Sequence, residues 1–255
     1  MSSLSETDSH DLELKRLKTS QTHCGTPQRV FVPPLRRVDP SKPPLSAQRP
    51  FPLSHGTTTL GFVFQGGVIA AADTRASAGG LVACPAVHKI TPIHSHLVVT
   101  SSGSGADCML WERILTREIR LYELRHKRRL SIRGSAKLLS LMLHPFKGTD
   151  VCVALTLGPR LVYVCSDGAR LQGDVISVGS GSPYAYGVLD GGLSWSLSKE
   201  EAVSLAREAV FRATHRDAYS GNNVDLFHVT AQGWIKVKID KYNSNKVMII
   251  TKLQK

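Results

Sequence analysis

Hydrophobic residues recur in short runs along the chain, and turn residues separate these runs. Residues 58–64 alternate in polarity and are β-prone, and a Gln65-Gly66-Gly67 turn joins them to the apolar run 68–73, which predicts a hairpin. Residues 76–80 are small and are expected to form a turn. Further strands or extended segments are predicted at residues 81–90, 96–100, 151–157, 161–165, 171–178, 224–229 and 234–239.

Three other segments have helical spacing. The first follows a glycine- and serine-rich break at residues 101–105, and its apolar stripe consists of Leu110, Ile114, Leu121 and Leu124. The second covers residues 132–143, and the third begins with a capping box, Ser198 with Glu201, and runs to about residue 214. The order is strands, two helices, strands, one helix, strands. Because both sheets must bury a face, we expect an α+β fold with two β-sheets packed together between helical layers.

The first part of the chain differs in composition from the rest. Residues 1–56 are rich in Ser, Thr, Pro, Lys and Arg, and their prolines prevent a regular element. We expect a disordered leader at 1–56 and one folded body at 57–255. The N-terminus lacks the apolar run of a signal peptide, and no segment approaches the ~20 apolar residues of a membrane span, so we expect no membrane association.

The chain is basic, with 32 Lys and Arg against 20 Asp and Glu and a formal net charge of +12. This charge is compatible with nucleic acid or an acidic protein partner. Nucleic acid is disfavoured, because the densest basic run, residues 125–129, has no interleaved aromatic residue and is typical of the end of a helix.

Cysteine and histidine spacing argues against disulfides and metals. Five scattered cysteines without a Cys-x-x-Cys pair indicate reduced thiols. His94 and His96 lie two apart in an extended stretch and are expected to point away from each other. No histidine pair has metal-binding spacing with a nearby acid, so we expect no metal and no cofactor.

The candidate chemistry lies at the start of the folded body. A threonine hydroxyl is a weak nucleophile, but a threonine at a chain terminus carries its own base, an α-amine with a pKa near ~8. Cleavage of the Gly56–Thr57 bond would create such a residue, and Gly56, without a Cβ, allows the backbone bend that brings the hydroxyl to the preceding carbonyl. Taken alone, the Gly-Thr-Thr-Thr run is more typical of the start of a β-strand.

Several segments recur in the same order in catalytic proteasome β subunits. They are Thr57-Thr58-Thr59-Leu60, Ala72-Asp73-Thr74-Arg75, His88-Lys89-Ile90, Ser166-Asp167-Gly168, Val178-Gly179-Ser180-Gly181-Ser182, Tyr184-Ala185-Tyr186-Gly187 and His215-Arg216-Asp217-Ala218-Tyr219-Ser220-Gly221. The chain resembles this family over residues 55–235 and is most similar to its chymotrypsin-like beta-5 class. Residues 83–86 and 182–184 are most similar to the thymus-specific beta-5 variant. The resemblance implies the four-layer αββα sandwich of N-terminal-nucleophile hydrolases, in agreement with the order of elements.

The resemblance also implies an activity. The activity is that of a threonine endopeptidase that acts on polypeptides inside the 20S core particle. The implied partners are the other alpha and beta subunits of that particle, and the implied location is cytoplasm and nucleus. Residues 1–56 would be a propeptide removed by self-cleavage before Thr57, and residues 57–255 the catalytic domain. Thr57 would be the nucleophile, Lys89 the cation that lowers the proton affinity of its hydroxyl and amine, and Asp73 the anchor of Lys89. Without the resemblance, Lys89 and Asp73 could equally be a surface lysine and a turn aspartate.

Further roles follow from the resemblance. Gly103 corresponds to the residue whose backbone N–H donates to the oxyanion. It lies just ahead of a predicted helix, where free N–H groups and the positive helix end are found. In the family, three residues hydrogen-bond around the threonine amine and hold its orientation; they correspond here to Ser180, Asp217 and Ser220. The pocket for the residue before the scissile bond would be lined by Ala76, Ser77, Val87, Ser101 and Gly105. Constitutive beta-5 subunits place a methionine where this chain has Ser101, so we expect weaker cleavage after large aromatic residues.

Two other functions remain open. One is a non-catalytic structural or assembly β subunit, a type that generally lacks Thr57, Asp73 or Lys89. The other is a different N-terminal-nucleophile amidohydrolase acting on a small amide. The presence of all three residues favours the peptidase, and the beta-5-like segments outside the site disfavour the amidohydrolase.

Overall fold

The computed structural model of the chain describes residues 56–78, 81–147, 153–158, 160–239 and 247–248. The helices are α2 (Gly105–His126), α3 (Ile132–Leu143), the short 3-10 helix η1 (His144–Phe146), α4 (Ser182–Gly192) and α5 (Lys199–Arg216). The strands are β1 (Thr59–Phe64), β2 (Gly67–Asp73), β3 (Ala76–Ala78), β4 (Leu81–Cys84), β5 (Ile90–His94), β6 (Leu97–Gly103), β7 (Val153–Gly158), β8 (Val162–Cys165), β9 (Arg170–Gln172), β10 (Val175–Val178), β11 (Val224–Thr230), β12 (Gly233–Ile239) and β13 (Val247–Met248). The predicted leader lies outside the described residues, except for Gly56.

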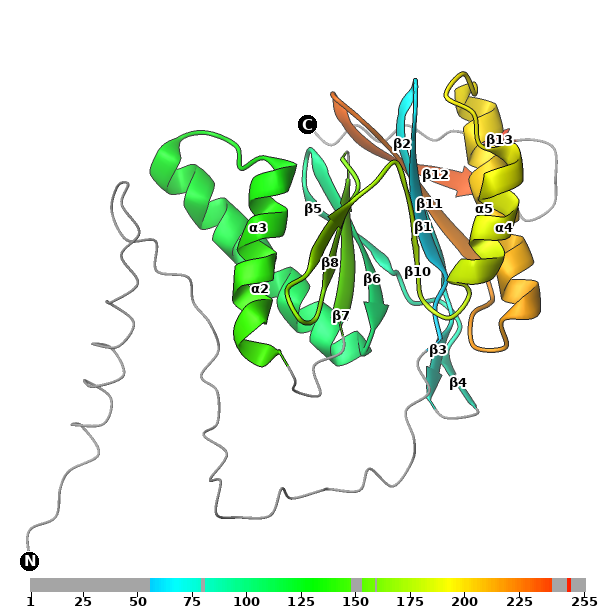
Figure 1. Cartoon of the computed structure of the whole chain (residues 1–255), viewed down its shortest axis with the longest axis horizontal. Helices are drawn as coiled ribbons and strands as arrows, with labels where there is room; N and C mark the ends of the chain where they lie inside the picture. The colour runs from blue at the N-terminus through cyan, green and yellow to red at the C-terminus, as the bar shows by residue number, and fades with distance from the viewer. Residues whose placement is uncertain (1–55, 79–80, 148–152, 159, 240–246, 249–255) are drawn as a thin grey trace, which may run out of the picture. The chain divides into compact units, whose positions relative to one another are not determined.

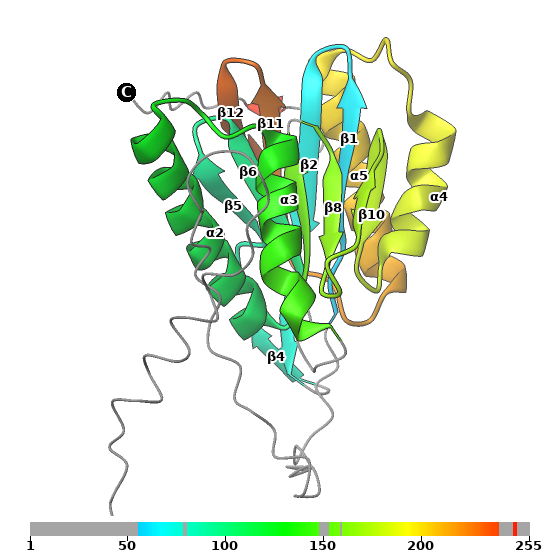
Figure 2. The ribbon, with the colours of Figure 1, turned by 60° about the vertical axis from the view of Figure 1, so that its left-hand side comes forward.

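The strands form two large sheets. One has the order β10-β1-β2-β11-β12-β13 and the other β5-β6-β7-β8-β9, while β3 and β4 pair by themselves. Helices α4 and α5 pack on the first sheet, and α2 and α3 pack on the second (Figures 1 and 2). The predicted αββα layering of an α+β fold is therefore confirmed.

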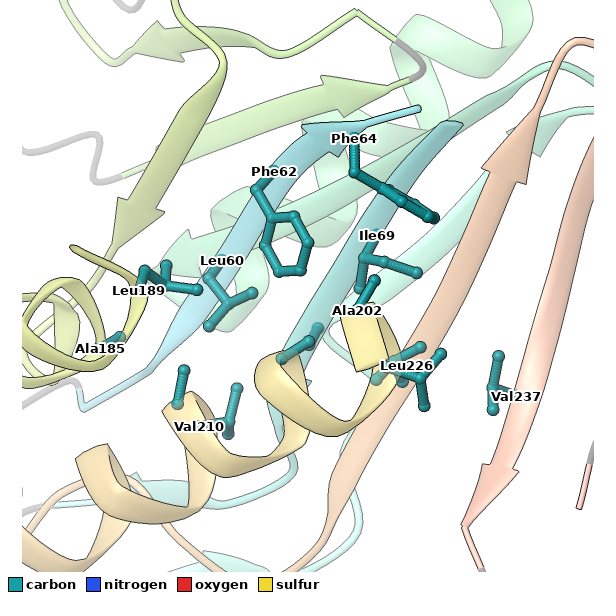
Figure 3. Close-up of a cluster of buried hydrophobic side chains, with 14 of the residues drawn as sticks. Leu60, Phe62, Phe64, Ile69, Ala185, Leu189, Ala202, Val210, Leu226 and Val237 are labelled. Carbon is teal, nitrogen blue, oxygen red and sulfur yellow. The ribbon is translucent and has the colours of Figure 1, made fainter. Parts of the chain in front are cut away.

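The β1–β2 hairpin shows why the first sheet is buried on both faces. Leu60, Phe62 and Phe64 of β1 point into the core beneath α4 and α5 (Figure 3). In β2, Ile69 contributes to the same core, and Val68 lies in the core between the two sheets. A strand covered on both faces needs a continuous apolar run rather than strict alternation, which explains residues 68–72.

Helix α5 covers this sheet with small residues. Ser198 and Glu201 form the predicted capping box, with both reciprocal hydrogen bonds present. The helix presents a fully buried stripe of alanines to the sheet, Ala202, Ala206, Ala209 and Ala213. A stripe without large side chains lets the helix axis approach the strands closely.

The N-terminal end of α2 and its buried face both differ from the prediction. Strand β6 continues through Ser101 and Ser102 to Gly103, so the expected break is shorter than residues 101–105. The buried face of the helix includes Trp111, Leu115 and Ile119, whereas the predicted stripe residues Leu110 and Leu124 are exposed. The predicted stripe is displaced around the helix, because it starts from Leu110 and omits Trp111, Leu115 and Ile119, which recur at helical spacing on the buried face.

Other differences concern short elements. Residues 76–78 form strand β3 rather than a turn, and the extended stretch predicted at 81–90 divides into β4 and the start of β5. The strand predicted at 171–178 is in fact two strands, β9 and β10, which belong to different sheets. Helix α4 was not predicted, because Pro183 and three glycines at 187, 191 and 192 hide its pattern; a proline in the first turn is compatible with a helix.

The prediction that His94 and His96 point away from each other was wrong. His94 ends β5 and His96 lies in the turn before β6, and their Nδ1 atoms lie 2.7 Å apart. His94 Nε2 also contacts Glu123 Oε2 at 3.0 Å. Among the described residues no group of His, Cys, Asp or Glu side chains could hold a metal ion. No helix in the described ranges is long and apolar enough to cross a membrane.

Candidate active site

The register of the first sheet gathers the candidate residues at one end of the sandwich. Thr59 pairs with Ala72 of β2 and with Val178 of β10, so Thr57 and Asp73 lie beside the loop that follows β10. Asp73 in turn pairs with Val224 at the start of β11, which brings in the loop after α5. Residues far apart in sequence therefore meet because four neighbouring strands begin or end here.

Thr57 lies in this buried end with its bond to Gly56 intact. The residue is only 6% exposed. Its Oγ1 donates to the Gly56 carbonyl oxygen at 2.6 Å, and its backbone N–H donates to Ser180 Oγ at 3.2 Å. The hydroxyl thus lies directly beside the carbonyl of the bond that the sequence analysis identifies as the cleavage site.

Lys89 supplies the buried cation. Its Nζ lies 2.7 Å from Asp73 Oδ1, 3.1 Å from Thr57 Oγ1 and 3.4 Å from the Gly56 carbonyl oxygen. Burial lowers the pKa of Lys89, while the Asp73 carboxylate opposes this effect. Neither residue is a surface group, because Lys89 is 6% exposed and Asp73 is fully buried.

Backbone amides hold Asp73 in place. Its Oδ1 accepts from the Thr58 N–H at 2.9 Å, and its Oδ2 accepts from the N–H groups of Gly221 and Arg75 at 2.8 and 3.2 Å. These three N–H donors satisfy both oxygens of a carboxylate that is closed off from water. The position of the lysine is therefore set by an anion that the backbone itself fixes.

A second network surrounds the threonine nitrogen. Asp217 Oδ2 accepts hydrogen bonds from Ser180 Oγ at 2.6 Å and from Ser220 Oγ at 2.7 Å. The Ser220 hydroxyl also lies 2.8 Å from Thr58 Oγ1. Asp217 is the C-cap of α5, where the helix dipole disfavours a negative charge, and it is nevertheless buried. These bonds fix the Ser180 hydroxyl against the Thr57 nitrogen.

Glycines allow the backbone to close around Thr57. Gly179 has a φ of 102°, and a Cβ on it would collide with the Thr57 carbonyl. A Cβ on Gly181 would collide with Thr58 Oγ1, and a Cβ on Gly56 would collide with Tyr219. The glycine-rich segment after β10 is thus a packing surface for the threonine, which the sequence pattern alone could not distinguish from a loop.

Gly103 ends β6 with a φ of 115°, and α2 begins two residues later. The N-cap of this helix, Ser104, makes no side-chain capping bond, so the first turn keeps N–H groups available at this end. The oxyanion role of Gly103 stays a prediction.

The predicted pocket residues flank the site. Ser101 N–H donates to the Lys89 carbonyl oxygen at 2.9 Å, and Val87 N–H donates to the Thr74 carbonyl oxygen at 2.9 Å, so both backbones are tied to the catalytic strands. Ser77 Oγ donates to the Tyr219 carbonyl oxygen. Ala76 is half-buried, and Gly105 is exposed with open space where a Cβ would stand. Their role as a substrate pocket stays a prediction.

Several buried residues near the site carry little signal in the sequence. Thr58 bonds both Asp73 and Ser220 and is fully buried. Glu112 is a buried acid of α2, and burial raises its pKa. The only signal in the sequence for Glu112 was an acid next to the buried Trp111, which is too weak to single it out.

The layered fold, with the buried threonine at the end of its sheets, is that of the N-terminal-nucleophile hydrolases. The family model described as proteasome subunit matches residues 53–229, and the chain belongs to this family. It is 46% identical to the probable proteasome subunit beta type-5 of Schizosaccharomyces pombe over 189 residues, 72% of this chain and 70% of that protein. It is 44% identical to the proteasome subunit beta type-5 of Gallus gallus over 219 residues, 84% of this chain and 83% of that protein. Identity to the Homo sapiens proteasome subunit beta type-8 is 47% over 192 residues, 73% of this chain and 70% of that protein.

Proposed function

We propose that Thr57 is the nucleophile of this chain and becomes its N-terminus by self-cleavage of the Gly56–Thr57 bond. The chain is a threonine peptidase subunit of the 20S proteasome core, as its beta-5 and beta-8 relatives indicate. One observation carries the assignment to Thr57. A single side-chain nitrogen, Lys89 Nζ, contacts the Thr57 hydroxyl, the Gly56 carbonyl and the Asp73 carboxylate at 3.1, 3.4 and 2.7 Å.

In the uncleaved chain Thr57 has no free amine, so another base must take its hydroxyl proton. Lys89 serves this role, because burial lowers its pKa and its Nζ lies 3.1 Å from the hydroxyl oxygen. Oγ1 bonds to the Gly56 carbonyl carbon, the bond from that carbon to the Thr57 nitrogen breaks, and Lys89 returns the proton to that nitrogen. Water then hydrolyses the resulting ester, which leaves a carboxyl group on Gly56 and restores the hydroxyl.

Substrate hydrolysis reuses the same hydroxyl with a new base. The α-amine freed by cleavage is held beside Ser180, whose hydroxyl is oriented by Asp217. This amine accepts the Thr57 hydroxyl proton, directly or through water, while Oγ1 attacks the substrate carbonyl. The proton passes to the leaving amine, and water hydrolyses the acyl ester. The Gly103 N–H stabilises the oxyanion of both tetrahedral intermediates.

The proposed organisation follows from this chemistry. Residues 1–56 are a propeptide that keeps the α-amine of Thr57 acylated until cleavage, and residues 57–255 are the catalytic domain. The subunit acts on polypeptides within the 20S core, beside other alpha and beta subunits, in the cytoplasm and nucleus. A non-catalytic structural subunit is not favoured, because Thr57, Lys89 and Asp73 are all present and in contact.

Within the beta-5 class we further assign the chain to the thymus-specific type. The support is the likeness of residues 83–86 and 182–184 to that variant, together with Ser101 in place of methionine. Peptide mass spectrometry of core particles from thymus and from other tissues tests this assignment. Equal abundance of the chain in all tissues would contradict it.

N-terminal sequencing of the chain in purified core particles tests the proposed function. We expect a chain that begins at Thr57, retention of the leader in Thr57→Ala, and normal cleavage in the matched Thr57→Ser variant, which keeps a hydroxyl. Recovery of wild-type chains that begin only upstream of Thr57 would contradict the proposal.

A further inference from the structure

Thr58 follows the nucleophile in the chain, and the catalytic proposal gives its hydroxyl no part. The residue is fully buried. Its backbone N–H donates to Asp73 Oδ1 at 2.9 Å, and its carbonyl oxygen accepts from the Asp73 N–H at 3.0 Å. Its side chain has a different neighbour, since Oγ1 lies 2.8 Å from Ser220 Oγ. Thr58 therefore joins the two hydrogen-bond networks that surround Thr57.

The donors in the second network follow from the acceptor at its centre. Asp217 Oδ2 accepts from Ser180 Oγ at 2.6 Å and from Ser220 Oγ at 2.7 Å. A serine hydroxyl has one proton to donate, and an ionised carboxylate has none. Because Asp217 holds the Ser220 proton, Ser220 Oγ accepts from Thr58, and the Thr58 hydroxyl is the donor. By the same reasoning Ser180 Oγ accepts from the Thr57 N–H, 3.2 Å away.

Nothing else in this space can take over the role of the Thr58 hydroxyl. Thr58 and Ser220 are both 0% exposed, so water does not reach the bond between them. The loop after β10 closes over the same point, because a Cβ on Gly181 would collide with Thr58 Oγ1 and lie 3.2 Å from Asp217 Oδ2. Loss of the hydroxyl would therefore leave the Ser220 oxygen without a donor in a dry site.

Packing alone does not require a hydroxyl here. Thr58 directly precedes β1, and the alternate residues that follow, Leu60, Phe62 and Phe64, are apolar and buried beneath α4 and α5. Valine has nearly the shape of threonine, is equally favoured in extended segments and has no polar atom to desolvate. The apolar row of β1 thus gives way to a polar side chain at the point where it meets the Asp217 network.

The uncleaved chain does not need this hydroxyl. Its base is Lys89, which is held by Asp73. Three backbone N–H groups hold Asp73 in turn, and one of them belongs to Thr58. A change in the Thr58 side chain leaves all three donors in place, so self-cleavage should not depend on it.

The cleaved chain does need it, because the base is now the α-amine of Thr57. This amine must turn its lone pair towards the Thr57 hydroxyl, and its contact with Ser180 Oγ sets that orientation. The Ser180 hydroxyl is fixed by Asp217. The same carboxylate oxygen also accepts from Ser220, the residue to which Thr58 donates.

We propose that the Thr58 hydroxyl is a positioning group for substrate hydrolysis and has no comparable part in self-cleavage. Its proton holds Ser220, and Ser220 holds the Asp217 carboxylate that orients the base. This inference rests on the proposed function, because only a free α-amine on Thr57 makes this network part of the reaction.

The test measures the two reactions separately in core particles that contain the full chain. Intact mass gives the extent of leader removal over time. Hydrolysis of a fluorogenic peptide gives kcat/KM, after subtraction of the rate of Thr57→Ala particles and division by the number of chains that begin at Thr57. Thr58→Val should lower this kcat/KM roughly tenfold, since one buried acceptor loses its donor. Leader removal should stay close to wild type. Thr58→Ser keeps the hydroxyl and should restore most of the activity.

Two controls separate positioning from damage to the strand. Thr59→Val is the matched change one residue on, because Thr59 is also buried and its Oγ1 donates to the Val178 carbonyl oxygen at 3.3 Å, outside the Asp217 network. It should leave both reactions near wild type. In a Ser220→Ala background, Thr58→Val should have no further effect on kcat/KM, because the oxygen that accepts from Thr58 is gone.

The outcomes distinguish the inference from the proposed function. Unchanged kcat/KM in Thr58→Val, an equal loss of both reactions, or no rescue by Thr58→Ser would overturn the inference. An equal loss in Thr59→Val, or a further loss in the Ser220→Ala background, would also overturn it. Failure of Thr58→Val particles to assemble would do the same, since the hydroxyl would then serve the fold. Peptide hydrolysis that Thr57→Ala does not reduce would instead contradict the proposed function.

Discussion

Replacement of Lys89 by alanine removes the side chain that bonds to both the Thr57 hydroxyl and the Gly56 carbonyl oxygen of the uncleaved site. Nζ contacts Thr57 Oγ1 and the Gly56 carbonyl oxygen, and it is ion-paired with Asp73. The Lys89→Ala variant should therefore lose both self-cleavage and peptide hydrolysis, because both reactions use the same hydroxyl. Lys89→Arg should rescue poorly, since a planar guanidinium cannot place a compact charge at the same three contacts.

The magnitude follows from the geometry. Loss of a positioned acid–base group lowers a rate by roughly 10²–10⁴-fold. Breaking a buried ion pair destabilises a protein by about 3–5 kcal/mol, and we expect the lower end, because Asp73 keeps hydrogen bonds from the Thr58, Arg75 and Gly221 N–H groups. Native domains have about 5–15 kcal/mol of stability, so the variant should still fold.

The assay separates the two reactions. Immunoblots of purified particles measure retention of the leader, and peptide hydrolysis measures turnover. A second chain, in which a removable fusion partner exposes Thr57 directly, bypasses self-cleavage; Lys89→Ala in this background should still be inactive. Arg212→Ala is a control, because this exposed arginine pairs with Glu208 on the same helix, α5. Near wild-type hydrolysis by Lys89→Ala particles would refute the role assigned to Lys89.

Three further predictions concern the same site. Gly56→Ala should slow self-cleavage, because a Cβ there collides with Tyr219; unaltered processing on immunoblots would show that this packing does not matter. Asp217→Asn should lower kcat/KM roughly tenfold to a hundredfold, because an amide has only one acceptor oxygen and cannot accept from Ser180 and Ser220 and also from the Tyr219 N–H, which bonds the other carboxylate oxygen; peptide kinetics on particles measure this loss. The self-cleavage rate should rise with pH and level off below the pKa of free lysine (~10.4), because burial lowers the Lys89 pKa and the neutral amine is the base. A self-cleavage rate that falls with pH over this range would contradict the role of Lys89 as the base.

Local patterns in the sequence determined much of the scaffold. The β1–β2 hairpin, helix α3 and the capping box of α5 all occur where the apolar runs, turn residues and caps predict them. These features depend on neighbours within a few residues, and such neighbours are visible in a single sequence. The motifs around Thr57, Asp73 and Lys89 likewise indicated the family before any coordinates.

Contacts between distant segments were decided only by the tertiary structure. Sequence runs could not show that β9 and β10 belong to different sheets, because the chain crosses between them within two residues. They also could not show that Asp217, at the end of a helix, would be buried against Ser180, or that Glu112 of α2 would be buried. Each of these depends on the packing of one layer on another, which brings together residues that local spacing does not relate.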